Sequence, residues 1–360
     1  MGRCINNIDE SRESPMSKTF TLAKHVINRF TPEQMKWMWG QGLLMYALSL
    51  IDEAHGTDNF TPFISRYYNA HLKRGIKIVS SDTLAPSLGA YMLWSKTSRA
   101  EYKHIAENAA GYMHTANRIL EHLPNHMGTG IYSKMYPKSI WVDSVMMYGV
   151  FAGRYSNEQG DNALAEFALR QLPLFEKYLR DEKYGLFYHS YWTYMKKHYP
   201  SKPIFWGRGN GWIMAAMPLM LPFLPEGPMK DEAIRIFRDL ARALLPYQLQ
   251  NGYFETLLHP KGVSYKESSA TALIAAGLIY GGRTGILDME CLKAGLKAFK
   301  AVEDSICEDK HGLCLPNISA PTIPVPGLPL AGYLFTPTGK NLTYGLAALI
   351  FAALEAGKCQ

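Results

Sequence analysis

The segment Ile204-Phe-Trp-Gly-Arg-Gly-Asn-Gly-Trp212 groups side chains that can recognise a planar anion. Arg208 offers a fork that matches a carboxylate, and Trp206 and Trp212 offer ring faces for stacking. The three Gly residues permit close backbone approach, and a glycine-rich loop that begins a helix also binds anions. Phosphate is the rival ligand, but neither the P-loop pattern nor a strand-borne G-x-G-x-x-G is present. The segment therefore favours a carboxylate ligand, with a tight turn and a structural Arg208 ion pair as the alternative.

Candidate residues elsewhere each have a structural interpretation beside the functional one. Asp143, alone in an aromatic segment, can be a satisfied structural group, and Asp82 in Ser-Asp-Thr can belong to a helix cap. His189 can be a buried, hydrogen-bonded histidine, and a structural role is favoured for Glu267. These residues need a wider pattern before a catalytic role can be assigned to them.

Metal-ligand spacing is missing from the sequence. No H-E-x-x-H occurs, and the five cysteines include no C-x-x-C pair (Cys4, Cys291, Cys307, Cys314 and Cys359). We therefore expect neither a metal nor a cofactor. Cys307 and Cys314 can approach each other across a loop.

Helical periodicity recurs along the chain. Thr31-Pro-Glu-Gln34 predicts a capping box with Pro32 in the first turn, followed by apolar residues at three- and four-residue steps up to the stop signal Gly56. Further amphipathic runs bring the number of expected helices to about twelve: 19–30, 62–78, 84–97, 100–123, 139–154, 161–180, 209–223, 229–249, 268–280, 288–306 and 342–357. Ile213 to Leu224 and Ala270 to Tyr280 are apolar nearly all round, which predicts buried helices.

An even number of alternating inner and outer helices indicates an all-α fold in which helical hairpins close into a toroid. A solenoid would need a constant repeat, and the sequence has none. We expect a single domain over residues 19–360, preceded by a flexible N-terminal extension of residues 1–18. The Pro-rich stretch Leu315 to Pro337 is expected to form a long ordered loop that shapes or covers a site.

Composition excludes several classes of protein. Hydrophobic residues make up 47% and charged residues 19%, which argues against disorder. The net charge of +7 can attract anions, but Lys and Arg are scattered singly and no basic run supports nucleic acid, so a solvated surface is the first interpretation and a small acidic ligand the second. Neither a signal-peptide pattern nor a stretch able to cross a bilayer is present. We therefore expect a cytoplasmic protein with reduced thiols, as a monomer or weak homo-oligomer.

Several motifs together resemble one family. W-G-R-G-N-G-W is similar to the W-[AG]-R-G-N-G-W signature of the unsaturated rhamnogalacturonyl hydrolases (glycoside hydrolase family 105) and the related unsaturated glucuronyl hydrolases (family 88). Further segments resemble motifs of these enzymes in the same order, across roughly residues 35 to 356: Ser81-Asp-Thr-Leu-Ala-Pro-Ser87, Ile140-Trp-Val-Asp-Ser-Val-Met-Met147, Tyr188-His189, Lys266-Glu-Ser-Ser-Ala-Thr-Ala272 and Tyr344-Gly-Leu-Ala-Ala-Leu349. Motifs in a common order are more specific than any one alone.

The resemblance implies an (α/α)6 barrel and a hydrolase. Such an enzyme removes a 4,5-unsaturated uronic acid from the non-reducing end of lyase-generated oligosaccharides by hydrating the C4=C5 bond, without metal or cofactor. By its place in the W-x-D-x-x-x-M helix, Asp143 is the catalytic acid and base, and Asp82 is the second Asp, which orients the sugar or tunes Asp143. The expected substrate-binding residues are Arg208, Trp206, Trp212, His189, Trp141, Trp39 and Tyr132.

The chain departs from the rhamnogalacturonan-type pattern at two places. Where these enzymes commonly have H-K-K-I-Y-P-H, this chain has Tyr132-Ser-Lys-Met-Tyr-Pro-Lys138. Where they typically have G-W-D, it has Ser190-Tyr-Trp192. The walls beside the second sugar therefore differ, and the motifs do not assign rhamnose to that position. Two alternatives come from other classes: a sugar isomerase or epimerase on the same barrel, and a non-catalytic protein that binds acidic sugars.

Overall fold

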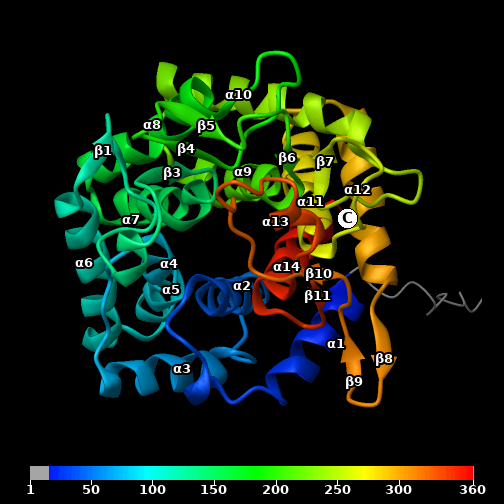
Figure 1. Cartoon of the computed structure of the whole chain (residues 1–360). Coiled ribbons are helices and arrows are strands. Elements are labelled where there is room, and N and C mark those ends of the chain that lie inside the picture. Colours follow the sequence, from blue (N-terminus) through cyan, green and yellow to red (C-terminus); the bar gives the residue numbers. More distant parts are fainter. Residues whose placement is uncertain (1–15, 360) are drawn as a thin grey trace, which may run out of the picture.

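The computed structural model describes residues 16–359, apart from the side chains of residues 16, 17, 131 and 132. Within this part of the chain, twelve α-helices of ten residues or more alternate between an inner and an outer ring (Figure 1). The inner helices are α2 (Trp39–His55), α5 (Ser87–Thr97), α7 (Val150–Gln159), α9 (Gly207–Met220), α11 (Ser268–Arg283) and α14 (Thr343–Gly357). The outer helices are α1 (Met16–Ile27), α3 (Thr61–Arg74), α6 (Ala100–Thr115), α8 (Asn162–Leu179), α10 (Pro228–Leu244) and α12 (Met289–Asp304).

The inner ring is closed. Each inner helix contacts the next one around the ring, and α14 contacts α2, which completes the circle. Each outer helix packs on an inner helix, for example α12 on α11, α6 on α5 and α8 on α7. The fold is therefore the (α/α)6 barrel that the helical periodicity and the motifs predicted.

Helices α9 and α11 are buried because they are apolar on nearly every side. From Ser268 to Gly281 every residue of α11 is buried, and α9 is buried throughout except at Leu219. Glycines let these two helices approach closely, since a Cβ on Gly277 would lie 2.5 Å from the Met214 carbonyl oxygen. The two segments predicted to be buried helices are confirmed.

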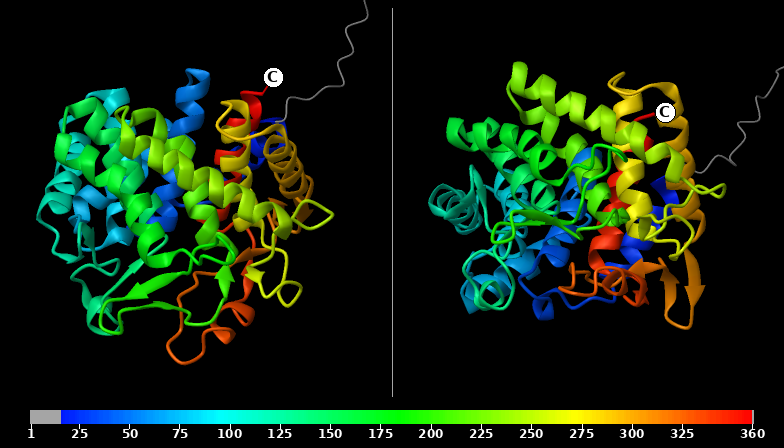
Figure 2. Two further views of the ribbon diagram at one scale, coloured as in Figure 1. Left: turned by 90° about the horizontal axis from the view of Figure 1, so that it is seen from above. Right: turned by 45° about the horizontal axis from the view of Figure 1, so that its top comes forward.

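Short strands and long loops gather at one end of the helical ring (Figure 2). The strands form five small antiparallel sheets: β1 (Arg118–Leu120) with β2 (Leu123–Pro124), β3 (Ser139–Trp141) with β4 (Ser190–Trp192) and β5 (Lys197–Tyr199), β6 (Phe205–Trp206) with β7 (Leu257–His259), β8 (Cys307–Asp309) with β9 (Gly312–Cys314), and β10 (Ile318–Ser319) with β11 (Thr338–Gly339). The last pair closes the stem of the loop predicted over residues 315–337. That loop contains the four-residue helix α13 (Ala331–Leu334) and lies over the centre of the ring (Figure 1).

Several predicted helix bounds were wrong. The 100–123 run ends as a helix at Thr115 and continues as β1, and the 139–154 run begins as β3, followed by a π-helical turn at Val145–Gly149 and by α7. The predicted capping box at Thr31 is also wrong: residues Pro32–Gln34 form one turn of 3-10 helix without a side-chain cap, and α2 begins at Trp39.

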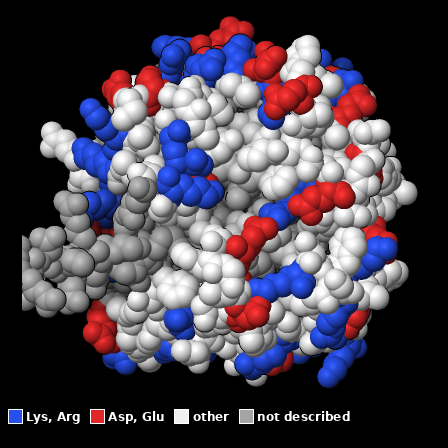
Figure 3. Space-filling model, turned by 180° about the vertical axis from the view of Figure 1, so that it is seen from behind, with Lys and Arg blue, Asp and Glu red and all other residues white. Residues whose placement is uncertain are grey.

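The surface opposite the loop end carries charges of both signs. Lys and Arg side chains are interspersed with Asp and Glu side chains on this face, without a large patch of one sign (Figure 3). No helix in residues 16–359 combines the length and the apolar character needed to span a membrane. Residues 1–15 of the predicted N-terminal extension lie outside the described part of the chain.

Candidate active site

A cavity of about 730 Å³ lies at the loop end of the barrel. It is lined by residues at the start of α2, α9 and α14, by the β3–α7 connection, and by the 315–337 loop. The lining residues that the sequence analysis had selected are Asp82, Asp143, Arg208, Trp39, Trp141 and Trp206. Five candidates from three separate motifs, together with Trp39, thus face one cavity.

Asp143 lies at the junction of β3 and the helical segment that follows it, rather than within a regular helix. Strand β3 pairs with β4, and the Val142 amide donates to the His189 carbonyl oxygen at 3.0 Å. This pairing brings two distant motifs together. Oδ2 of Asp143 lies 3.4 Å from Nε2 of His189, and the carboxylate is 9% exposed on the floor of the cavity.

Asp82 approaches the cavity from the four-residue helix α4 (Ser81–Leu84). Ser80 caps this helix and forms a capping box with Thr83, so the cap does not use the Asp82 carboxylate. The structural interpretation of Asp82 as a helix cap is therefore wrong. Its Oδ1 lies 3.8 Å from Nε2 of His126.

His126 is a site residue that the sequence analysis missed. It is buried, it lines the cavity, and its ring stacks on Trp141 at 4.4 Å. Its Nδ1 lies 2.9 Å from the Ser144 hydroxyl, next to Asp143 in the sequence. The segment around His126 has no periodicity or motif that would have identified it, because tertiary packing alone brings it to the carboxylates.

The two carboxyl groups differ in pKa. Burial, assisted by the negative charge of Asp143, raises the pKa of Asp82 to about 7. Burial also acts to raise the pKa of Asp143, but its interactions with His189 and His126 hold it below its usual value. Near neutral pH Asp82 is therefore partly protonated while Asp143 is a carboxylate, a combination that acid–base chemistry can use.

Burial lowers the pKa of both histidines. The pKa of His126 falls to about 4, and that of His189 lies below its usual value although Asp143 opposes the shift. We therefore treat both rings as neutral at pH 7. A neutral His189 stabilises the Asp143 carboxylate through an N–H dipole rather than through a full charge.

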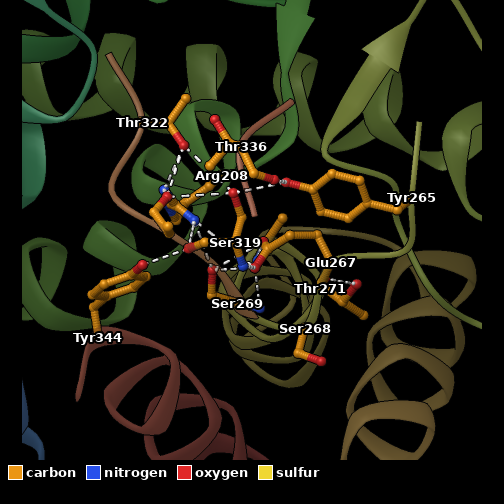
Figure 4. A network of polar contacts seen from close by, with 12 residues as sticks. Arg208, Tyr265, Glu267, Ser268, Ser269, Thr271, Ser319, Thr322, Thr336 and Tyr344 are labelled. Carbon is orange, nitrogen blue, oxygen red and sulfur yellow. Dashed lines mark hydrogen bonds and ion pairs between the residues drawn. The ribbon is translucent and has the colours of Figure 1, made fainter. Parts of the chain in front are cut away.

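Arg208 lies in a buried polar network, and its guanidinium group is hydrogen-bonded to protein groups (Figure 4). Its Nη1 donates to the Ser319 carbonyl at 3.0 Å, and its Nη2 donates to the Ala320 carbonyl at 3.0 Å and the Thr322 hydroxyl at 3.1 Å. Glu267 lies 3.8 Å from Nη1 and accepts the Ser319 amide at 2.9 Å. Both terminal nitrogens of Arg208 thus donate hydrogen bonds to the 315–337 loop.

Glu267 also caps helix α11. Its carboxylate accepts from the backbone amides of Ser269 and Ala270 and from the Ser269 hydroxyl. The structural role favoured for Glu267 therefore agrees with its contacts. The same carboxylate links the start of α11 to the start of the loop.

The predicted aromatic walls divide into two groups. Trp39, Trp141 and Trp206 line the cavity, whereas Trp212 is buried behind Trp39 in an edge-on contact at 6.0 Å and is not among the lining residues. His189 is likewise buried behind the wall, stacked on Trp206 at 4.2 Å. The side chain of Tyr132 lies outside the described part of the structure.

The glycine-rich segment does not form the expected loop. Gly207, Gly209 and Gly211 lie in the first turns of α9, where an added Cβ would meet the Glu255 carbonyl oxygen at 2.4 Å, the Trp206 ring at 2.8 Å and Leu273 at 3.0 Å. These glycines allow packing between protein segments, rather than approach of a ligand to the backbone.

The two departures from the motif pattern have different consequences. Met135 and Tyr136 from the 132–138 run line the cavity, so this change alters its wall. Trp192 instead stacks on Tyr199 at 4.2 Å and is not among the lining residues. Among residues 16–359, no group of three or more His, Cys, Asp or Glu side chains is arranged to hold a metal ion.

The structure thus places a carboxylate pair in a tryptophan-lined cavity at the loop end of an (α/α)6 barrel, an arrangement suited to acid–base chemistry on a sugar. The chain belongs to Glycosyl Hydrolase Family 88, whose profile matches residues 10–360. The family assignment made from the ordered motifs is confirmed.

Relatives support this assignment. The unsaturated rhamnogalacturonyl hydrolase YesR of Bacillus subtilis (strain 168) is 26% identical over 297 residues, covering 81% of this chain and 83% of that protein. The unsaturated 3S-rhamnoglycuronyl hydrolase of Alteromonas sp. (strain LOR) is 28% identical over 218 residues, covering 60% of this chain. The match spans half the length of the Alteromonas enzyme.

Solved structures share the fold. A family 105 glycoside hydrolase of C. acetobutylicum ATCC 824 superposes with a TM-score of 0.82 at 22% identity, covering 94% of this chain and 99% of that one. The unsaturated glucuronyl hydrolase of Bacillus sp. GL1 superposes with a TM-score of 0.74 at 16% identity, covering 95% of each chain. At these identities the likeness establishes the barrel architecture.

Proposed function

We propose that the protein removes a 4,5-unsaturated uronic acid from the non-reducing end of lyase-generated acidic oligosaccharides by hydrating the C4=C5 bond. The observation that carries the proposal is the Asp82 and Asp143 pair, which shares one cavity and has pKa values shifted in opposite directions. The family and its named relatives favour this hydrolase over an isomerase or a non-catalytic binding protein.

The cavity suits an anionic sugar ring. Trp39, Trp141 and Trp206 offer surfaces for the apolar faces of a sugar. The N-terminal ends of α2, α9 and α14 meet the cavity, and their dipoles favour negative charge. Arg208 adds positive charge from the floor. Because its terminal nitrogens are bound to the loop, it attracts the uronate by charge rather than as a free bidentate fork.

The substrate is an enol ether, because its C4=C5 bond is adjacent to the ring oxygen. A proton delivered to C4 leaves positive charge shared by C5 and the ring oxygen, and water then adds at C5. The resulting hemiketal opens, which converts C1 into a hemiacetal that releases the second sugar. The net reaction consumes one water molecule, and the catalytic carboxyl group regains from that water the proton it gave to C4.

We assign delivery of the proton and activation of the water to Asp143, and storage of the proton to Asp82. In the free protein the proton resides on Asp82, since burial and the Asp143 charge hold it there. A bound uronate adds a third negative charge, which favours protonation of Asp143. His189 and His126 then stabilise the Asp143 carboxylate that remains after the proton has moved to C4.

A panel of lyase-generated unsaturated disaccharides tests the proposal. The protein should abolish the ultraviolet absorbance of the C4=C5 bond in at least one of them, at a rate proportional to enzyme concentration. Failure with galacturonyl and glucuronyl members alike would contradict the proposed function. We further propose a cytoplasmic location and a monomer or weak homo-oligomer, which cell fractionation and light scattering test.

A further inference from the structure

The 315–337 loop contains one tyrosine that points into the protein. Tyr333 in α13 is 0% exposed, although Leu330 and Phe335 beside it are exposed. Its hydroxyl lies 2.9 Å from Nδ1 of His189, across 144 positions of sequence. No sequence motif pointed to Tyr333, and it is not among the residues that line the cavity.

His189 has a polar neighbour at each ring nitrogen. Its ring is stacked on Trp206 and makes a T-shaped contact with Trp141 at 5.0 Å, so aromatic rings pack against it from two directions. Nε2 lies 3.4 Å from the Asp143 carboxylate, and Nδ1 meets Tyr333. In this surrounding the tautomer of the imidazole depends on those two contacts.

The two contacts of His189 together favour one tautomer. A carboxylate only accepts hydrogen bonds, so the neutral ring must carry its proton on Nε2 to interact favourably with Asp143. Nδ1 then carries a lone pair, which accepts the Tyr333 O–H. Without that hydroxyl the Nε2–H form loses its hydrogen bond at Nδ1, so its preference over the Nδ1–H form becomes smaller.

We propose that Tyr333 is a positioning residue that fixes the Nε2–H tautomer of His189 and thereby links seating of the 315–337 loop to the charge of Asp143. The catalytic consequence rests on the proposed function, because it takes Asp143 as the acid–base group. The tautomer itself does not depend on that assignment.

The contacts at the base of the loop explain the link. Arg208, Glu267 and Tyr344 hold Ser319, and the Tyr265 hydroxyl donates to the Thr336 carbonyl at 2.9 Å (Figure 4). Tyr333 lies between these anchored ends and contacts His189 from the loop. The hydrogen bond between Tyr333 and His189 therefore connects the loop to the catalytic carboxylate.

Tyr333→Phe tests the inference, because it removes the hydroxyl and keeps the buried ring. We expect kcat to fall roughly tenfold, the effect of one hydrogen bond. The acid limb of the profile of kcat/KM against pH should shift to higher pH, because the Asp143 carboxylate loses stabilisation and its pKa rises. The other ionisable groups facing the His189 and Asp143 pair are Asp82, His126 and Arg208, and the variant leaves them unchanged.

Tyr265→Phe is the matched control. It removes a hydroxyl that holds the same loop through Ser319 and Thr336 but does not touch His189. Because Arg208, Glu267 and Tyr344 still hold Ser319 in this variant, we expect the loop to stay seated and the wild-type pH profile to be retained. In a His189→Gln background, Tyr333→Phe should cause no further loss, because its effect passes through His189.

Nitrogen-15 NMR of the histidine rings, with His189 assigned from its absence in His189→Gln, measures the tautomer independently of turnover. The wild type should show the Nε2–H form, and Tyr333→Phe should show a larger share of Nδ1–H. An unchanged tautomer in Tyr333→Phe, or an equal shift of the pH profile in Tyr265→Phe, would overturn the inference. A changed tautomer in a protein that hydrates no unsaturated disaccharide would instead uphold the role of Tyr333 and refute the proposed function.

Discussion

Replacing Arg208 by Lys should destabilise the protein because the loop depends on the guanidinium fork. Arg208 is 1% exposed and donates to two loop carbonyls and to the Thr322 hydroxyl, with Glu267 beside it. A single ammonium keeps the charge but reaches only part of these acceptors. Hydrogen bonds to charged groups contribute about 1.5–3 kcal/mol each, so the loss of two should lower the free energy of unfolding by about 3–6 kcal/mol.

Two assays distinguish a loop anchor from a direct carboxylate ligand. Denaturant unfolding gives the stability loss, and limited proteolysis between residues 315 and 337 gives the opening of the loop. Arg154→Lys is the control, because Arg154 is also buried and paired, with Glu53 at 2.7 Å and Glu158 at 3.1 Å, but does not line the cavity. The control should lose stability while its KM and loop proteolysis stay at wild-type values.

The reasoning would be refuted by an Arg208→Lys variant with wild-type stability and a protected loop. If such a variant still showed a large rise in KM, Arg208 would be a direct ligand of the uronate carboxylate, as the sequence first indicated. In that event its contacts with Ser319 and Ala320 would have to yield to the substrate.

Three other changes have defined outcomes. Asp143→Asn should lower kcat by about 10²–10⁴-fold or more while calorimetry still detects binding of an unsaturated disaccharide, and a near-normal kcat would remove Asp143 from the chemistry. The profile of kcat/KM against pH should fall as pH rises through about 7, where Asp82 loses its proton, and Asp82→Asn should abolish that limb; persistence of the limb would assign it to another group. Activity should survive excess chelator, since no metal-binding cluster is found among residues 16–359, and loss of activity with recovery on adding one divalent ion would contradict the mechanism.

The sequence predicted the barrel because long amphipathic and fully apolar helices carry a strong periodic signal. The prediction of a helix over residues 139–154 was wrong for its first residues. Ser139–Trp141 pairs with Ser190–Trp192, and a three-residue strand has no detectable period of its own. Pairing with a strand distant in sequence thus determines the local structure here, which the intrinsic propensity of the residues does not predict.

The candidate site was predicted unevenly for a similar reason. Asp82, Asp143 and Arg208 came from recognisable motifs and face one cavity. His126 and Tyr333 were missed, because one lies in a loop and the other in a four-residue helix, and both reach the site through contacts distant in sequence. Trp212 was expected to bind sugar because it ends the glycine motif, but the helical turn of α9 carries it behind Trp39.

Isotope labelling tests the central claim most directly. In heavy water the protein should place one deuteron at C4 of the released keto acid, and water labelled with oxygen-18 should deliver its label to C5. This outcome requires protonation and hydration of the C4=C5 bond. Solvent oxygen found only at the anomeric carbon would show that the protein cleaves the glycosidic bond directly, as an ordinary glycosidase does, and would contradict the proposed reaction.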